Sequence, residues 1–146
     1  MLAGRRGVAA AARVAWPDAP VDAVLDAIDL GNHDASGDSY WTLDPIDGTK
    51  GFLRGGQYAV SLALIERGQV TLGVLGCPNL AESHARAFDD PDPRGTLFYA
   101  TRGGGSWMVP ADRPTLSARR QDASRLEDIG AMRVCESVEA AHSRLD

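Results

Sequence analysis

The chain has 146 residues, 44% of them apolar and 24% charged, so it has the composition of an ordinary globular protein and a length typical of about one domain. Its 15 Lys and Arg against 20 Asp and Glu give a net charge of −5, which argues against a broad cationic surface for a nucleic-acid polymer. Its most apolar stretch, residues 58–75, is interrupted by Gly, Arg, Glu and Gln and does not predict a membrane-spanning helix. We therefore expect neither a nucleic-acid polymer nor a membrane as a partner.

The cysteine content bears on the compartment. Cys77 and Cys135 are far apart in the sequence and form no Cys-x-x-Cys pair, which argues against a disulfide framework and a structural zinc site. The short apolar run after Arg5 and Arg6 is interrupted by Arg13, which is not typical of a signal peptide. We expect a reducing, cytoplasmic setting.

Two helices are predicted near the N-terminus. The first is Ala-rich, spans residues 8–16 and stops at Pro17, whose ring and missing N–H block its continuation. The second opens at Pro20, and Gly31 is expected to be the residue just after its end. Its apolar residues recur at the spacing of one helical face, which we expect to pack on a core: Val21, Val24, Leu25 and Ile28.

The middle of the chain predicts strands. Residues 40–43 have strong strand propensity and lead directly into a turn at 44–49. Within residues 58–65 the large apolar side chains of Val60, Leu62 and Leu64 alternate with small side chains. Residues 70–75 resume after a polar turn, which predicts an antiparallel hairpin.

The last third of the chain predicts further strands and a loop. The Pro- and Asp-rich segment 78–94 is expected to be an exposed loop. Residues 96–101 and 106–109 flank a glycine-rich turn as a second hairpin, since that turn lacks the spacing of known phosphate-binding loops. Residues 132–135 are compatible with a short strand and 136–144 with a helix. A largely antiparallel sheet follows from the two hairpins.

The pattern Asp-Pro-x-Asp-Gly-Thr carries the strongest chemical signal. Pro45 fixes its own φ and restricts Asp44, so the carboxylates of Asp44 and Asp47 can be held at one rigid corner. Carboxylate and carbonyl oxygens are the ligands that Mg²⁺ prefers, and the carbonyl of Ile46 is a third candidate. An ordinary surface turn uses the same residue types, but the number of specified identities favours a functional motif.

The next two residues suit a phosphate group. Gly48 permits a close approach of the backbone to a ligand, and successive N–H groups can then donate to phosphate oxygens. Thr49 adds a hydroxyl beside the expected metal, and Lys50 and Arg54 could add local positive charge. The segment therefore predicts metal-assisted hydrolysis of a phosphate ester.

Several segments resemble a known family. Residues 41–52, with the sequence Trp-Thr-Leu-Asp-Pro-Ile-Asp-Gly-Thr-Lys-Gly-Phe, resemble the first metal motif of the inositol monophosphatase-like superfamily. Within that superfamily, residues 53–60 and 73–80 resemble the 3′(2′),5′-bisphosphate nucleotidases more than the inositol phosphatases. Residues 136–143 resemble the segment with which these nucleotidases contact the nucleotide.

The resemblance implies an α/β fold, a layered αβαβα sandwich with a mixed, largely antiparallel sheet, and Mg²⁺-dependent hydrolysis of adenosine 3′,5′-bisphosphate to AMP and phosphate. The substrate is then a small phosphorylated nucleotide. The resemblance implies that Asp44, Asp47 and the Ile46 carbonyl bind the metal. It implies catalytic roles for Asp47 and for Thr49, which helps to orient the attacking water. The implied substrate-binding residues are Gly48, Thr49, His142 and Ser143.

The chain also departs from the family pattern. An upstream Glu-Glu metal motif with an acidic water-activating residue is expected, but Glu66 is the first glutamate. A downstream Trp-Asp-x-Ala-Gly motif is expected, but Trp107 is followed by Met108. We therefore expect residues 1–146 to form a single, incomplete domain, which a homodimer could complete by supplying ligands. An inositol or sugar phosphatase of the same superfamily, and a non-catalytic remnant that binds metal or nucleotide, stay open as alternatives.

Overall fold

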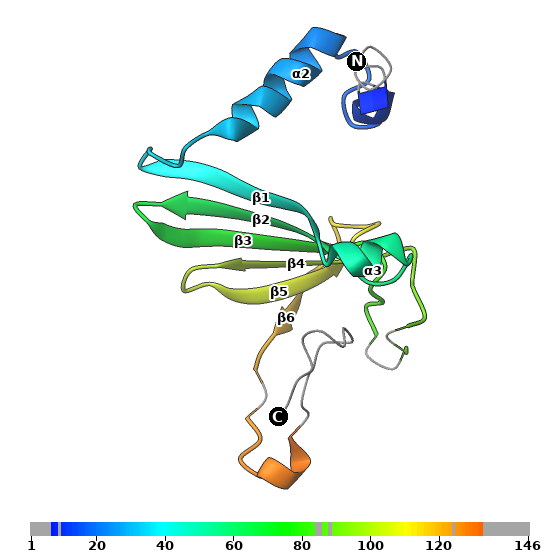
Figure 1. Cartoon of the computed structure of the whole chain (residues 1–146). Helices are drawn as coiled ribbons and strands as arrows, with labels where there is room; N and C mark the ends of the chain where they lie inside the picture. The colour runs from blue at the N-terminus through cyan, green and yellow to red at the C-terminus, as the bar shows by residue number, and fades with distance from the viewer. Residues whose placement is uncertain (1–6, 9, 84–85, 88, 124, 133–146) are drawn as a thin grey trace, which may run out of the picture.

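The computed structural model describes residues 7–8, 10–83, 86–87, 89–123 and 125–132. Six strands form one sheet whose spatial order follows the chain, from β1 at one edge to β6 at the other (Figure 1). The strands are β1 (Ser39–Asp47), β2 (Ala59–Glu66), β3 (Gln69–Cys77), β4 (Thr96–Thr101), β5 (Gly105–Pro110) and β6 (Arg119–Gln121). The helical elements are α2 (Val21–Asp29), the 3₁₀ turn η1 (Leu30–Asn32), α3 (Thr49–Leu53) and the 3₁₀ turn η2 (Ile129–Ala131).

Each described strand pairs antiparallel with its neighbours. Helices together with a largely antiparallel sheet confirm the predicted fold class. Both predicted hairpins are confirmed as well. Arg67 and Gly68, with φ of 51° and 72°, make the two-residue turn between β2 and β3. Positive φ at both positions is typical of the type I′ turn, whose twist matches that of the flanking strands.

The first strand is longer than predicted. The sequence predicted a strand over 40–43 and a turn over 44–49, but β1 continues to Asp47. Between Asp44 and Asp47 the register with β2 shifts, because β1 advances by three residues while β2 advances from Ser61 to Ala59. The predicted turn is therefore a β-bulge at the end of an edge strand, followed by α3. Bulges bend a strand locally and redirect its side chains.

Within the sheet, the best-buried side chains lie at one end. Met108 and Val109 of β5 are almost fully buried, as are Thr96 at the start of β4 and Cys77 at the end of β3. Thr96 pairs with both Cys77 and Pro110, so these residues form one cluster. Figure 1 shows α3 at the same end of the sheet. This end is therefore the most rigid support that the described residues offer to a site.

The predicted helices form, with two corrections. Residues 7–8 and 10–12 are helical, and the chain leaves the helix before Pro17. Helix α2 was expected to pack its apolar face on a core, but it lies beyond the β1 edge of the sheet (Figure 1), and Ile28 is 55% exposed although Val24 is buried. Gly31 follows the C-cap residue Leu30, as expected, whereas the first helix, expected over residues 8–16, ends at residue 12.

Four short elements were not predicted. They are η1, α3, β6 and η2. Strand β6 includes Arg119 and Arg120, and it forms through its pairing with β5. Of the strand predicted over 132–135, only Met132 is described, and it follows η2 directly. Residues 133–135 and the helix expected over 136–144 lie outside the described residues. No helix in the part of the chain that the structure describes has the length and apolarity needed to cross a membrane.

Candidate functional site

The candidate site lies where the bulged end of β1 passes through Gly48 into α3. Pro45 has no N–H to donate to a ladder, and the bulge of an edge strand is a position that tolerates this loss. Asp44 still pairs with Ser61, and Asp47 pairs with Ala59 beyond the bulge. The predicted ligands Asp44, Ile46 and Asp47 are therefore brought to one short, bent segment.

The backbone of Ile46 connects the two sides of this segment. Its N–H donates to Oδ1 of Asp44 at 3.1 Å, and its carbonyl accepts a hydrogen bond from Oγ1 of Thr49 at 3.1 Å. An aspartate that accepts from the N–H two residues later forms an Asx turn, which fixes its own side chain. Asp44 and Thr49 are thus oriented by the two backbone groups of the same residue, Ile46.

Gly48 makes the turn into α3. Its φ of 79° and ψ of 43° are left-handed, a conformation that is strained for any residue with a Cβ. A Cβ there would also lie 3.7 Å from Cα of Tyr58. The carbonyl of Gly48 accepts from the N–H of Phe52 at 3.1 Å and closes the first turn of α3. A glycine is therefore required for the chain to bring Thr49 beside Ile46.

The site is open to solvent. Asp44, Asp47 and Thr49 are exposed, and Ile46 is half-buried. Among the described residues, no group of three or more His, Cys, Asp or Glu side chains is positioned to hold a metal ion. Two carboxylates, one carbonyl and one hydroxyl are nevertheless hard oxygen donors, which suit Mg²⁺ with several ligands left to water or phosphate. The donor set fits the predicted metal as an open, partial site.

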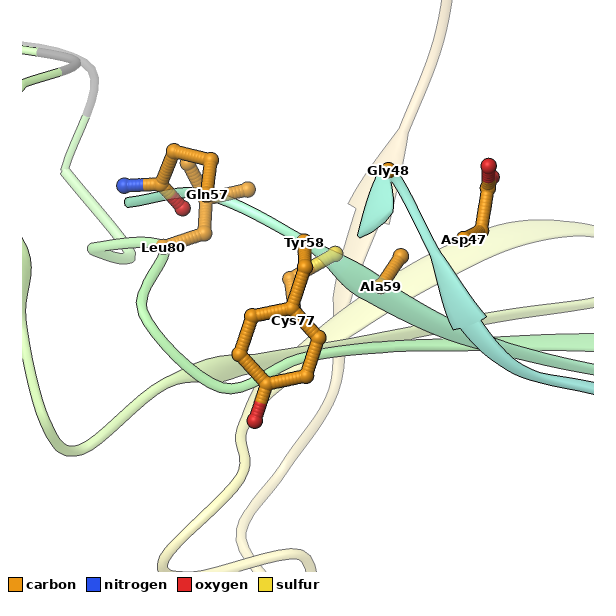
Figure 2. Close-up of a pocket in the computed structure, with 7 residues that line it drawn as sticks. All are labelled: Asp47, Gly48, Gln57, Tyr58, Ala59, Cys77 and Leu80. Atoms are coloured by element: carbon orange, nitrogen blue, oxygen red, sulfur yellow. The ribbon is translucent and has the colours of Figure 1, made fainter. Parts of the chain in front are cut away.

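A cavity of about 240 Å³ adjoins this segment (Figure 2). In the close-up the carboxylate of Asp47 and the phenol of Tyr58 point in opposite directions, and Asp47 is exposed to solvent. Cys77, a buried free thiol, lies in the wall, and burial raises the pKa of this thiol. The lining residues are Asp47, Gly48, Gln57, Tyr58, Ala59, Cys77 and Leu80.

Sequence reasoning assigned no role to most of this cavity. Gln57, Tyr58 and Cys77 lie in the two segments that resemble the nucleotidases, residues 53–60 and 73–80, but no individual role was predicted for them. The hairpin register could have located them, because Val60 pairs with Gly76 and Ala59 with Asp47, which brings the end of β3 close to the end of β1. The signal therefore lies in strand pairing and not in residue type.

The two predicted nucleotide contacts, His142 and Ser143, lie outside the described residues. The structure brings together the other five predicted site residues, which are contiguous in sequence apart from Pro45: Asp44, Ile46, Asp47, Gly48 and Thr49. All five lie in the last residues of β1 or in the first turn of α3 that follows it.

Comparison with known proteins gives a consistent family. The model of the inositol monophosphatase family matches residues 19–144. The 3′(2′),5′-bisphosphate nucleotidase 1 of Arabidopsis thaliana is 44% identical over 130 residues, which cover 86% of this chain and 36% of that protein. The 3′(2′),5′-bisphosphate nucleotidase of Emericella nidulans is 43% identical, over 84% of this chain and 38% of that protein.

A third relative has the same kind of name, and one solved structure is similar to part of the chain. The 3′(2′),5′-bisphosphate nucleotidase 2 of Candida albicans is 42% identical, over 82% of this chain and 35% of that protein. The chain thus spans little more than a third of the length of these relatives. The crystal structure of CysQ from Bacteroides thetaiotaomicron, a bacterial member of the inositol monophosphatase family, is 19% identical with a TM-score of 0.42 and covers 73% of this chain and 44% of that one.

Proposed function

The chain belongs to the inositol monophosphatase family, and on that premise we propose that it is a Mg²⁺-dependent phosphatase that converts adenosine 3′,5′-bisphosphate to AMP and phosphate. The observation that carries the proposal is the bulged segment from Asp44 to Thr49, which gathers two carboxylates, a carbonyl and a hydroxyl at one exposed corner. The names of the relatives support the substrate, since all three are 3′(2′),5′-bisphosphate nucleotidases.

In this proposal Asp44, Asp47 and the carbonyl of Ile46 hold the metal ion. When bound, Mg²⁺ supplies Lewis acidity that lowers the pKa of a ligated water and neutralises charge on the phosphate. The protein's part is to orient these oxygens, and the hydrogen bond from the Ile46 N–H does so for the carboxylate of Asp44. Asp47 is assigned a catalytic role because its carboxylate would hold this ion.

Thr49 orients the attacking water. Its Oγ1 donates a hydrogen bond to the Ile46 carbonyl. The lone pairs of Oγ1 are therefore left to accept a hydrogen bond from that water. Gly48 and Thr49 present their backbone N–H groups to phosphate oxygens, which a side chain at position 48 would hinder. Binding and water orientation are therefore combined in two adjacent residues.

The remaining parts of the proposal rest on sequence. His142 and Ser143 contact the nucleotide, because the segment that contains them resembles the nucleotide-contacting segment of the relatives. The partner is a small phosphorylated nucleotide and not a polymer, in keeping with the net charge of −5. The free thiol of Cys77 supports a reducing, cytoplasmic setting. A homodimer is proposed from the exposed apolar side chains of β1, Trp41 and Leu43.

A direct assay tests the proposal. Phosphate release is measured with Mg²⁺ on adenosine 3′,5′-bisphosphate and, in parallel, on an inositol monophosphate. We expect release from the nucleotide, loss of release in Asp47→Asn, and no change in Asp26→Asn, an exposed aspartate of α2 that serves as the matched control. Faster release from the inositol phosphate would assign the chain to the sugar phosphatases of the family. Mg²⁺ or nucleotide binding without release would identify a non-catalytic binding protein.

A further inference from the structure

Two loops are tied together behind the candidate site by Asn79, a half-buried residue that follows β3. Its side-chain Nδ2 donates to the carbonyl of Gly56 at 2.6 Å. In return, Nε2 of Gln57 donates to the backbone carbonyl of Asn79 at 3.0 Å. The segment that leaves α3 is therefore held by reciprocal hydrogen bonds to a loop more than twenty residues away.

The held segment packs directly against the start of α3. The N–H of Gly56 donates to the carbonyl of Gly51 at 2.8 Å. A Cβ at Gly51 would overlap the carbonyl oxygen of Gln57, so the two backbones are in contact with no side chain between them. A displacement of Gly56 and Gln57 is consequently transmitted to α3 without a flexible side chain to absorb it.

On its other side, Asn79 is held by the segment around a buried carboxylate, that of Asp92. The backbone carbonyl of Asn79 also accepts from the N–H of Asp92 at 2.9 Å. Asp92 is 3% exposed, and its carboxylate pairs with Arg94 at 2.7 Å and with Arg86 at 3.5 Å. Asn79 thus links a well-buried anchor to the loop that supports α3.

We propose that Asn79 is a positioning residue, whose amide sets where the first turn of α3, and with it Thr49, stands relative to Asp47. The proposal rests on the proposed phosphatase function, because Thr49 and Asp47 are the groups being positioned. A catalytic group that moves by a fraction of an ångström loses rate strongly while substrate affinity changes less. The expected signature is therefore a fall in kcat with little change in KM.

Two substitutions isolate the amide. Asn79→Ala removes the donor to Gly56 but leaves the backbone carbonyl that holds Gln57 and Asp92. Asn79→Asp keeps the shape and, near neutral pH, places a carboxylate against the Gly56 carbonyl. A protonated carboxyl regains a donor, and the facing carbonyl favours the protonated form. Only the aspartate variant can therefore recover the hydrogen bond as the pH falls.

The assay follows phosphate release with Mg²⁺ between about pH 8 and about pH 5, relative to the unsubstituted chain at each pH. We expect kcat of both variants to fall about tenfold near neutral pH, with KM changed by less than about twofold. Asn79→Asp should recover toward low pH, whereas Asn79→Ala should not. Asn32→Asp, the same change in the exposed turn η1, is the matched control and should follow the unsubstituted chain throughout.

A purely structural role predicts a different outcome. In that case both substitutions would lower the unfolding temperature but leave kcat unchanged wherever the protein is folded. The kcat of Asn79→Asp would then show no recovery at low pH. That result would overturn the proposal.

Amide hydrogen exchange provides a second readout that needs no activity. The N–H groups of Gly56 and Phe52, bonded to Gly51 and Gly48, should exchange faster in Asn79→Ala, while amides in β4 should not change. If the unsubstituted chain releases no phosphate, the proposed function fails, and the exchange rates alone then decide whether Asn79 holds α3. If the N–H groups of Gly56 and Phe52 exchange no faster in Asn79→Ala than in the unsubstituted chain, the positioning role is contradicted.

Discussion

The exposed carboxylate of Asp47 is the residue on which metal binding should depend most. Asp44 already accepts a hydrogen bond from the Ile46 N–H, and Asp47 is exposed to solvent at the end of β1. With two carboxylates at an open site, Mg²⁺ is expected to bind weakly, since most of its ligands are then water. Asp47→Asn should lower the Mg²⁺ affinity, measured by calorimetry, by at least about tenfold because a full charge at the ion is lost. Equal affinities in Asp47→Asn and in the Asp26→Asn control would remove Asp47 from the metal site.

Asp92 gives the protein a pH-dependent contribution to stability. Hydrogen bonds from the side chain and backbone of Arg94, together with the charge of Arg86, lower the pKa of Asp92 to about 2. Because the unfolded chain binds this proton more readily, the stabilisation is complete above about pH 4 and is lost as the pH falls through about 2. Asp92→Asn should therefore reduce the free energy of unfolding near neutral pH, and its difference from the unsubstituted chain should shrink on acidification.

Urea denaturation between about pH 7 and about pH 2 measures this difference. The control is Asp122→Asn, since Asp122 also pairs with an arginine, Arg120, at 3.2 Å, but both side chains are exposed. An exposed pair contributes little, so the control should change the free energy of unfolding only slightly. A deficit of Asp92→Asn that stays constant down to about pH 2 would show that its carboxylate charge is not what stabilises the loop.

At the scale of elements, the β2–β3 hairpin contains a strained turn. Arg67 adopts a φ of 51°, which costs a residue with a Cβ about 1 kcal/mol, whereas asparagine tolerates this region and precedes glycine in the most favoured hairpin turns. Arg67→Asn should raise the free energy of unfolding by about 0.5–1 kcal/mol in urea denaturation. Arg125→Asn, at an exposed arginine with no positive φ, should produce no such gain. No gain at Arg67 either would mean that the turn is not strained.

The hairpins could be predicted from the sequence because their alternation and turn residues are local. Helix α3 could not, because five residues are too few for an apolar period and only the turn at Gly48 and the packing on Gly51 define it. Strand β6 could not be predicted either, since it has no apolar alternation and forms by pairing with β5. Residues 44–49 were predicted as a turn but form a bulged strand end and the start of α3, because proline and glycine mark bulges as well as turns.

For the candidate site, too, only the local part could be predicted from the sequence. Asp44, Asp47 and Thr49 are close in sequence, so their residue types alone indicate the chemistry. Asn79 and Gln57 contribute through backbone carbonyls of a distant loop, and such contacts leave no pattern in a single sequence.

Across the whole sheet, one face is made of large apolar side chains. Directly paired residues of antiparallel strands point to the same face. Two rows across the sheet therefore share this face, one formed by Trp41, Leu64 and Leu72, the other by Leu43, Leu62, Val74, Tyr99 and Trp107. On β1 these side chains remain open, since Trp41 is 55% and Leu43 is 57% exposed. A continuous apolar surface of this kind favours association.

We expect a second copy of the chain to cover this face, so that the protein dimerises with rising concentration in sedimentation velocity. Leu43→Lys places a charge within the apolar face and removes the area that a leucine buries, which should weaken the dimer by about tenfold or more. Leu30→Lys, at a 79% exposed leucine of η1 beyond the sheet, is the matched control and should associate as before. Because each copy carries a net charge of −5, added salt should screen the repulsion and strengthen the dimer. A chain that stays monomeric at every concentration and salt level, or a Leu43→Lys variant that associates like the control, would contradict this role for the face.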